Sequence, residues 1–175
     1  GAAVFDPLKV VKNGGPAITS AVLRPGPSTG GGTSVVSDGT ATQTLAYDNL
    51  EPVVDTTPVA LLTISGNAGD DTISYTQGTS ADTALVAVDA FETYEFKNKT
   101  AVVIDAGGGS DTVTLSDPTT PAGLTSLTVQ NAETVTATGI PGTTDSMRYV
   151  PTAQGTGQLI DDGTPQVPLT FAGVD

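Results

Sequence analysis

The 175-residue chain has no cysteine, histidine or tryptophan, and only six of its residues are lysine or arginine. The lack of cysteine excludes disulfides and thiolate metal sites. The lack of histidine removes the commonest general base and zinc ligand. The net charge is −13, which argues against binding to nucleic acids or anionic membranes, because both require a basic surface. An acidic chain does remain suited to divalent cations, which prefer carboxylate and carbonyl oxygens.

Long apolar runs and large side chains are also scarce. The chain contains no run of 18 apolar residues, so no membrane span is predicted. Aromatic residues make up 5% of the chain, which is little for a compact core and suits a thin, stacked β architecture. Threonine, in contrast, occurs 30 times, and β-branched residues favour strands. We therefore expect an all-β protein, with at most one helical turn within Thr119–Leu127.

One motif recurs about every 20 residues: an acid, usually a threonine, and then alternating apolar and polar positions. The copies are Asp71–Tyr75, Glu92–Phe96, Asp111–Leu115 and Glu133–Ala137, with Glu51–Val54 as a weaker fifth. A longer period is superimposed, since Glu51, Glu92, Glu133 and Asp175 follow one another at 41, 41 and 42 residues. An internal repeat of this length is typical of a β-solenoid and too short for a helix pair.

We therefore predict a parallel β-solenoid-like stack with coils of about 20 residues. Alternate side chains of each strand would point inward, and the acids that begin successive strands would lie above one another. The alternative is a β-sandwich with evenly spaced strands. The predicted inward-facing residues are Leu62, Ile64, Ile73, Tyr75, Tyr94, Phe96, Val102, Ile104, Val113, Leu115 and Val135.

Two regions depart from the repeat. Residues 1–38 hold one predicted strand, Val4–Val11, followed by a Gly/Pro/Ser-rich segment, Arg24–Ser34, that is expected to be loop or linker. Residues 39–175 form the repeat β domain, within which 139–168 are an irregular insertion. That insertion reads as a hairpin, with a turn predicted at Asp161–Thr164.

The glycine-rich corners Gly66–Ser74 and Ala106–Thr114 resemble the calcium-binding nonapeptide G-G-x-G-x-D-x-U-x of the RTX, or haemolysin-type, family. In that family calcium lies between adjacent coils. The resemblance implies a calcium site here, for which Asp70, Asp71, Asp105 and Asp111 are the candidate ligands. Residues 40–175 also resemble the long repetitive secreted or cell-surface β proteins of environmental bacteria, which implies an extracellular location.

A second interpretation of the corner acids needs no metal. Stacked carboxylates about 5 Å apart repel one another by about 1 kcal/mol in water, and the repulsion must be offset. Backbone N–H groups of the same corner can do this, as they do in Asx turns. The glutamate copies favour this interpretation, because their corners lack glycines.

Three functions follow from these features. The first is a structural module of an extracellular filament or matrix, assembled as a homo-oligomer or fibre through open strand edges, with glycans on its threonine-rich surface. The second is an adhesin or carbohydrate-binding module that uses Tyr47 or Tyr149. The third is a polysaccharide-degrading β-helix enzyme, for which Asp70–Asp71 and Asp161–Asp162 are the paired carboxylates. The first is preferred, and catalysis is not expected.

Overall fold

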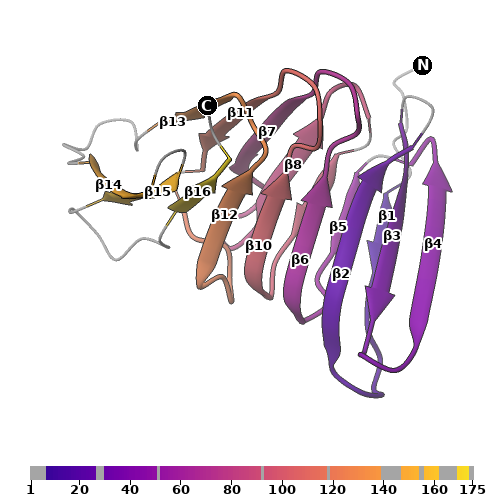
Figure 1. Ribbon diagram of the computed structural model, residues 1–175. Coiled ribbons are helices and arrows are strands. Elements are labelled where there is room, and N and C mark those ends of the chain that lie inside the picture. Colours follow the sequence, from indigo (N-terminus) through magenta and orange to yellow (C-terminus); the bar gives the residue numbers. More distant parts are fainter. Residues whose placement is uncertain are drawn as a thin grey trace.

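The computed structural model is an all-β protein built from two mixed sheets that face each other (Figure 1). It describes residues 7–26, 30–50, 52–91, 93–117, 119–138, 147–153, 156–161 and 169–173. Within these residues no helix forms, so none is long and apolar enough to cross a membrane. The all-β prediction is confirmed.

The smaller sheet has seven strands in the order β1-β5-β9-β8-β7-β11-β13. Their bounds are Leu8–Val10 (β1), Val53–Asp55 (β5), Tyr94–Phe96 (β9), Ala84–Val88 (β8), Thr72–Gln77 (β7), Thr112–Ser116 (β11) and Thr134–Ala137 (β13). The larger sheet has nine strands in the order β14-β15-β16-β12-β10-β6-β2-β3-β4. Their bounds are Met147–Ala153 (β14), Thr156–Asp161 (β15), Leu169–Ala172 (β16), Ser126–Gln130 (β12), Lys99–Asp105 (β10), Val59–Ser65 (β6), Ile18–Pro25 (β2), Gly31–Ser37 (β3) and Thr42–Asp48 (β4).

Parallel pairing dominates both sheets, except at the two ends of the larger sheet and around β8 in the middle of the smaller one. In the nine-stranded sheet β2, β6, β10, β12 and β16 run parallel. In the seven-stranded sheet two groups are parallel, β1-β5-β9 and β7-β11-β13. The chain alternates between the sheets at β6–β7 and again from β10 to β13, so strands of equal direction come to lie side by side.

The spacing of the paired strands differs from the prediction. Six of the eight parallel pairings join residues 40–45 positions apart, as Ile18 with Val59 and Val59 with Lys99. Only β10–β12 and β11–β13 have short spacings, of 25 and 22 residues. A coil of 20 residues is therefore wrong for most of the molecule. The reason is that the long segments contain additional antiparallel strands. These are β3 and β4 between β2 and β6, β8 between β6 and β10, and β14 and β15 between β12 and β16.

Antiparallel strands form both ends of the nine-stranded sheet. At one end β2, β3 and β4 form a meander. The predicted linker at residues 24–34 is wrong in part, because Arg24 pairs with Thr33 and Pro25 with Gly32. Gly26 N donates to Gly31 O at 2.8 Å. This hydrogen bond joins the two ends of the connection between β2 and β3 and so stabilises the hairpin. Residues 1–38 thus supply β2 and β3 to the same sheet as the repeat strands.

The other end of the sheet is formed by β14, β15 and β16. The predicted insertion within 139–168 contains the antiparallel pair β14–β15, and β15 then pairs antiparallel with β16. The hairpin interpretation is confirmed for these strands. Most of the predicted turn at 161–164 lies outside the described residues. At the N-terminal side, the described part of the predicted strand 4–11 is β1, which pairs with β5 of its own chain.

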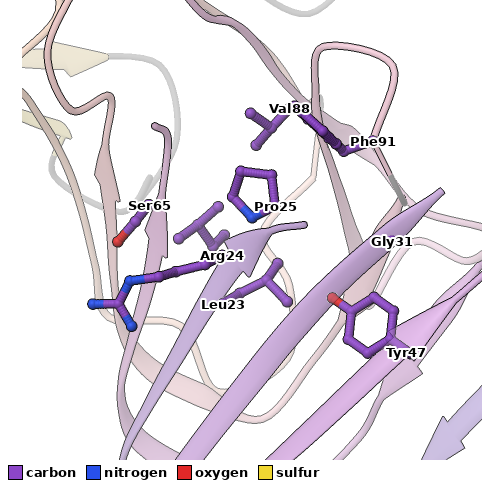
Figure 2. A pocket seen from close by; sticks show the side chains of 9 residues that line it. Leu23, Arg24, Pro25, Gly31, Tyr47, Ser65, Val88 and Phe91 are labelled. Atoms are coloured by element: carbon purple, nitrogen blue, oxygen red, sulfur yellow. The ribbon is translucent and has the colours of Figure 1, made fainter. Parts of the chain in front are cut away.

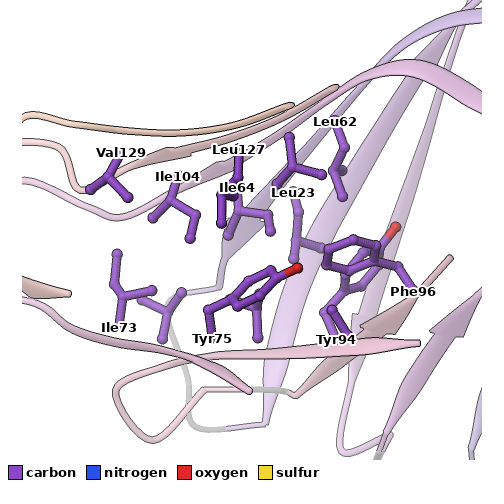
Figure 3. Packing of buried hydrophobic residues seen from close by; sticks show 14 of the residues in the cluster. Leu23, Leu62, Ile64, Ile73, Tyr75, Tyr94, Phe96, Ile104, Leu127 and Val129 are labelled. Carbon is purple, nitrogen blue, oxygen red and sulfur yellow. The ribbon is translucent and has the colours of Figure 1, made fainter. Parts of the chain in front are cut away.

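The core lies between the two sheets. Figure 3 shows Ile73, Tyr75, Tyr94 and Phe96 of the smaller sheet directed toward Leu62 and Ile64 of the larger one. Each such burial of a large apolar side chain stabilises the fold by about 1.5–3 kcal/mol. The predicted inward positions are confirmed as buried, except that Val135 is only partly buried.

Candidate functional site

The corner acids form a column where the chain enters the smaller sheet. Asp71, Asp111 and Glu133 each precede a strand, β7, β11 and β13 respectively. The next residues, Thr72, Thr112 and Thr134, are aligned across these three strands. The prediction that equivalent acids stack is therefore confirmed for these three residues, while Glu51, Glu92 and Asp175 lie outside the described residues.

Hydrogen bonds link each corner of the column to the next. The backbone N–H of Asp71 donates to Asp111 Oδ1 at 2.7 Å. The backbone N–H of Asp111 donates in turn to Glu133 Oε2. The carboxylates of Asp111 and Glu133 thus each accept from the corner stacked against them. A glutamate serves in the same way as an aspartate, because the bond needs only a carboxylate oxygen.

Asp71 also accepts hydrogen bonds from its own corner, as the metal-free interpretation predicts. Asn67 N donates to Asp71 Oδ2 at 2.8 Å, and Asn67 Nδ2 donates to Oδ1 at 2.5 Å. Asp89, at the end of the antiparallel strand β8, accepts from Thr72 N at 2.7 Å. Both carboxylates therefore hold backbone or amide N–H groups at the start of β7.

Burial makes this column electrostatically unusual. Asp71 and Asp111 are only 2% and 1% exposed. Burial raises the pKa of Asp71 to about 6, and the neighbouring carboxylates of Asp89 and Asp111 act in the same direction, whereas the N–H of Asn67 opposes them. Asp111 Oδ2 is buried and has no hydrogen-bond partner. The column therefore favours a neutral Asp71 at mildly acidic pH.

The other two predicted calcium ligands have different partners. Asp70 is exposed and its Oδ1 accepts from Ser110 N at 2.8 Å. Asp105 accepts from Gln130 Nε2 at 3.0 Å and from Asn131 Nδ2 at 2.8 Å. No group of three or more acidic side chains within the described ranges is close enough to hold a metal ion. Calcium binding by Asp70, Asp71, Asp105 and Asp111 therefore stays a prediction.

Glycine at a corner allows the backbones of two stacked corners to approach each other closely. Gly107 has φ of +100°, and a Cβ added there would lie 2.1 Å from the carbonyl oxygen of Asn67. The neighbouring Gly108 N donates to the same oxygen at 3.1 Å. A side chain at Gly107 would both strain the backbone and separate the two corners. This requirement explains the glycine at position 107 without reference to a metal.

Sequence reasoning missed two polar groups. Asp89 was not predicted beside the column, because the hairpin of β7 with β8 brings it there. The buried ion pair of Lys99 with Asp55 was missed as well. Lys99 has no sequence signal beyond being a charged residue at the start of an apolar run, and such residues are usually exposed.

The remaining predicted sites gain no support from the geometry. Tyr47 is 9% exposed, so its ring is not a platform for a glycan. It lines a small pocket with Leu23, Pro25 and Phe91 (Figure 2). The cavity volume of that pocket is about 10 Å³, which is room for about one water. The side chains of Tyr149, Asp161 and Asp162 lie outside the described residues, and Asp71 already accepts hydrogen bonds within the fold.

Comparison with protein-family models, with curated proteins and with solved structures finds no match to this chain.

Proposed function

We propose that the protein is a structural module of an extracellular filament or matrix, a solenoid-like stack that self-associates through its open strand edges. The observation that carries this proposal is the edge strand β4, which is the last strand at one end of the nine-stranded sheet as far as the structure describes it. An edge strand presents unpaired N–H and C=O groups, which are a template for another chain.

The composition of β4 lacks the usual protection of an edge. Its sequence TQTLAYD has no lysine, arginine or proline and only one acid, Asp48. Five of its seven residues are exposed. Natural sheets generally prevent edge pairing with charges, proline or a very short strand, and β4 has only the single carboxylate at its last position. It is therefore suited to pairing with a strand from a second molecule.

The opposite end offers edges of matching length. β14 has seven residues, as β4 does, and β13 has four where β1 has three. A head-to-tail contact of β4 with β14, and of β1 with β13, would continue both sheets into the next molecule. Such a contact is heterologous and builds an open fibre. Pro151 lies in β14 and removes one N–H donor there, so β4 is the stronger template.

The corner column supports a role in which the protein bears load. Backbone groups of successive corners are bonded to the buried carboxylate of Asp111 and to the carboxylate of Glu133. An extracellular location and glycans on the threonine-rich surface belong to the same proposal, as does any calcium bound at the corners. Calcium would be detected as a higher melting temperature that a chelator reverses.

Sedimentation tests the assembly. The purified full chain is expected to sediment as concentration-dependent oligomers or fibres. Thr44→Lys places a charge on the exposed edge strand and should shift the protein toward monomer without a change in melting temperature. Thr100→Lys is the matched control, because Thr100 is also exposed but lies on β10 in the middle of the sheet. A monomeric wild type at high concentration, or equal assembly of both variants, would refute the proposal.

A further inference from the structure

A buried polar centre connects the two sheets at some distance from the corner column. Lys99 at the start of β10 lies 3.0 Å from Asp55 at the end of β5, measured from Nζ to Oδ2. Their side chains are 0% and 1% exposed. Tyr94 and Thr57, both buried, complete the centre. Burying an ion pair costs several kcal/mol of desolvation per ion, so it is weak evidence for a purely stabilising role.

Three hydrogen bonds accompany the ion pair in this centre. Tyr94 Oη donates to Asp55 Oδ2 at 2.5 Å. Thr57 N donates to Asp55 Oδ1 at 2.8 Å. Lys99 Nζ donates to the carbonyl oxygen of Thr57 at 2.5 Å. The amine is thereby held against one carboxyl oxygen, while separate donors hold both oxygens.

From this geometry we infer that Lys99 and Asp55 condense to an intramolecular isopeptide bond that cross-links the two sheets. The inference does not depend on the proposed assembly. The reaction is Lys-NH₃⁺ plus Asp-COO⁻ giving an amide and one water, so it needs no oxidant, cofactor or external proton. Proximity of this kind replaces a bimolecular step by an intramolecular one.

The chain's own groups supply each step. A proton passes from Nζ to Oδ2, which leaves a neutral amine and a carboxylic acid. The amine lone pair then attacks Cγ, and the negative charge that develops on Oδ1 is stabilised by the N–H of Thr57, as in an oxyanion hole. A second proton from Nζ reaches Oδ2 through the Tyr94 hydroxyl, the Cγ–Oδ2 bond breaks, and water leaves. The remaining amide N–H donates to Thr57 O.

The surroundings favour a neutral amine on Lys99 and a protonated Tyr94 hydroxyl. Burial lowers the pKa of Lys99, although the Asp55 charge opposes this. Burial also raises the pKa of Tyr94 well above its ordinary value, so its hydroxyl stays protonated. In a water-excluded site the charged pair loses its hydration, and hydrolysis of the product is hindered.

The same chain contains an internal control. Lys97 and Asp82 form an ion pair at 2.7 Å, closer than Lys99 and Asp55, but their side chains are 31% and 50% exposed. Water reaches both side chains of this pair and can solvate them. Distance alone therefore predicts that Lys97 would react, whereas the buried geometry predicts that only Lys99 does.

Intact-mass spectrometry of the denatured full chain tests the inference. The wild type should be lighter than its sequence by one water, and Lys97→Arg should show the same loss. Lys99→Arg, which retains the positive charge but has no condensing amine, should have its full mass. Tryptic peptides of the wild type should include a branched species that joins the segments around residues 55 and 99. Tyr94→Phe should slow the reaction by about 100-fold in freshly folded protein.

Two results would overturn the inference. One is a wild-type chain that keeps its full mass after prolonged incubation in the folded state. The other is a water loss that persists in Lys99→Arg, because this would assign the dehydration to another position, such as a succinimide at Asp38–Gly39. The wild-type measurement decides the question even if a variant fails to fold.

Discussion

Strands β3 and β7 occupy equivalent places in the 41-residue period, yet they fold in opposite ways. β3 returns antiparallel onto β2 within the larger sheet. β7 crosses to the smaller sheet and pairs in parallel with β11. The strands before them, β2 and β6, are themselves aligned, with Ile18 beside Val59. The period of the sequence therefore does not decide the path of the chain, and the connections must do so.

The two kinds of connection differ in where their backbone groups are bonded. In the β2–β3 connection Gly26 N donates to Gly31 O, within the same hairpin. In the β6–β7 connection Gly66 N donates to Asp105 O at 2.7 Å, in the neighbouring turn of the chain. The hairpin connection thus satisfies this backbone N–H within itself. The corner that crosses between the sheets needs a carbonyl group of the neighbouring corner. Substitutions should accordingly cost more in the stack than in the hairpins.

The largest effect is expected for Gly107→Ala. The added methyl combines a positive φ with a 2.1 Å approach to Asn67 O, and together strain and overpacking should lower the free energy of unfolding by about 3–4 kcal/mol. Gly39→Ala is the control, because Gly39 has φ of +92° in the β3–β4 turn and its nearest neighbour is at 3.8 Å. It should cost about 1–2 kcal/mol. Equal losses in urea melts would show that stacking contributes nothing.

The local strands, their inward faces and the stacking of three corner acids could all be predicted from the sequence. Alternation of apolar and polar residues reports on one strand and its two faces, which explains why Ile73 and Ile104 were placed correctly. The coil length could not be derived in this way. A strand such as β8 alternates in the same manner whether it crosses to the other sheet or turns back, and only the connection at 78–83 separates the two outcomes.

The site was predictable to a similar degree. Asp71 and Asp111 were expected to stack because both precede equivalent strands, and they do. Asp89 joins them through the unpredicted hairpin. The ion pair of Lys99 with Asp55 could not be foreseen, because its members begin and end strands of different sheets. Their meeting depends on how the sheets pack rather than on any local pattern.

The second largest effect is expected for Asp111→Ala. The substitution leaves the buried N–H of Asp71 without its acceptor, which should cost about 2 kcal/mol in the free energy of unfolding. Asp111→Asn retains the Oδ1 acceptor and removes a buried charge next to Asp71, so its cost should be much smaller. In the hairpin region, Asp38→Ala removes the acceptor of Thr40 N and Ala41 N at an exposed turn. We expect it to cost less than Asp111→Ala, and the reverse order would contradict the comparison.

Acid pH should affect the two regions with opposite sign. Burial raises the folded-state pKa of Asp71 to about 6, above an unfolded value near 4. The native state then binds more protons between about pH 4 and 6, so this residue's contribution is fully present below pH 4 and is lost as the pH rises through 6. The backbone N–H of Ala41 lowers the pKa of Asp38, so its contribution is lost instead as the pH falls.

Paired variants isolate these two contributions. The stability of the wild type relative to Asp71→Asn should rise by about 2 kcal/mol from pH 7 to pH 4. The stability of the wild type relative to Asp38→Asn should fall only at still lower pH. Urea denaturation at each pH measures both differences, and titrating groups shared by the two proteins cancel. Parallel pH profiles of the wild type and Asp71→Asn would contradict the raised pKa.

The smallest effect concerns the left-handed residues that precede β5 and β13. Asn49 and Asn131 have φ of +54° and +57°, and glycine adopts this conformation without strain. Asn49→Gly, next to the hairpin region, retains the backbone bond to Gly30 O and should change the stability by no more than about 0.5 kcal/mol. Asn131→Gly also loses the bond from Nδ2 to Asp105 Oδ1 and should cost about 1 kcal/mol.

A double-mutant cycle with Asp105→Ala separates the loss of this side-chain bond from any effect on the backbone. The cost of Asn131→Gly should disappear once its carboxylate partner is gone. A cost that persists in the Asp105→Ala background would assign it to the backbone, and the stacked and hairpin corners would then not differ at this position.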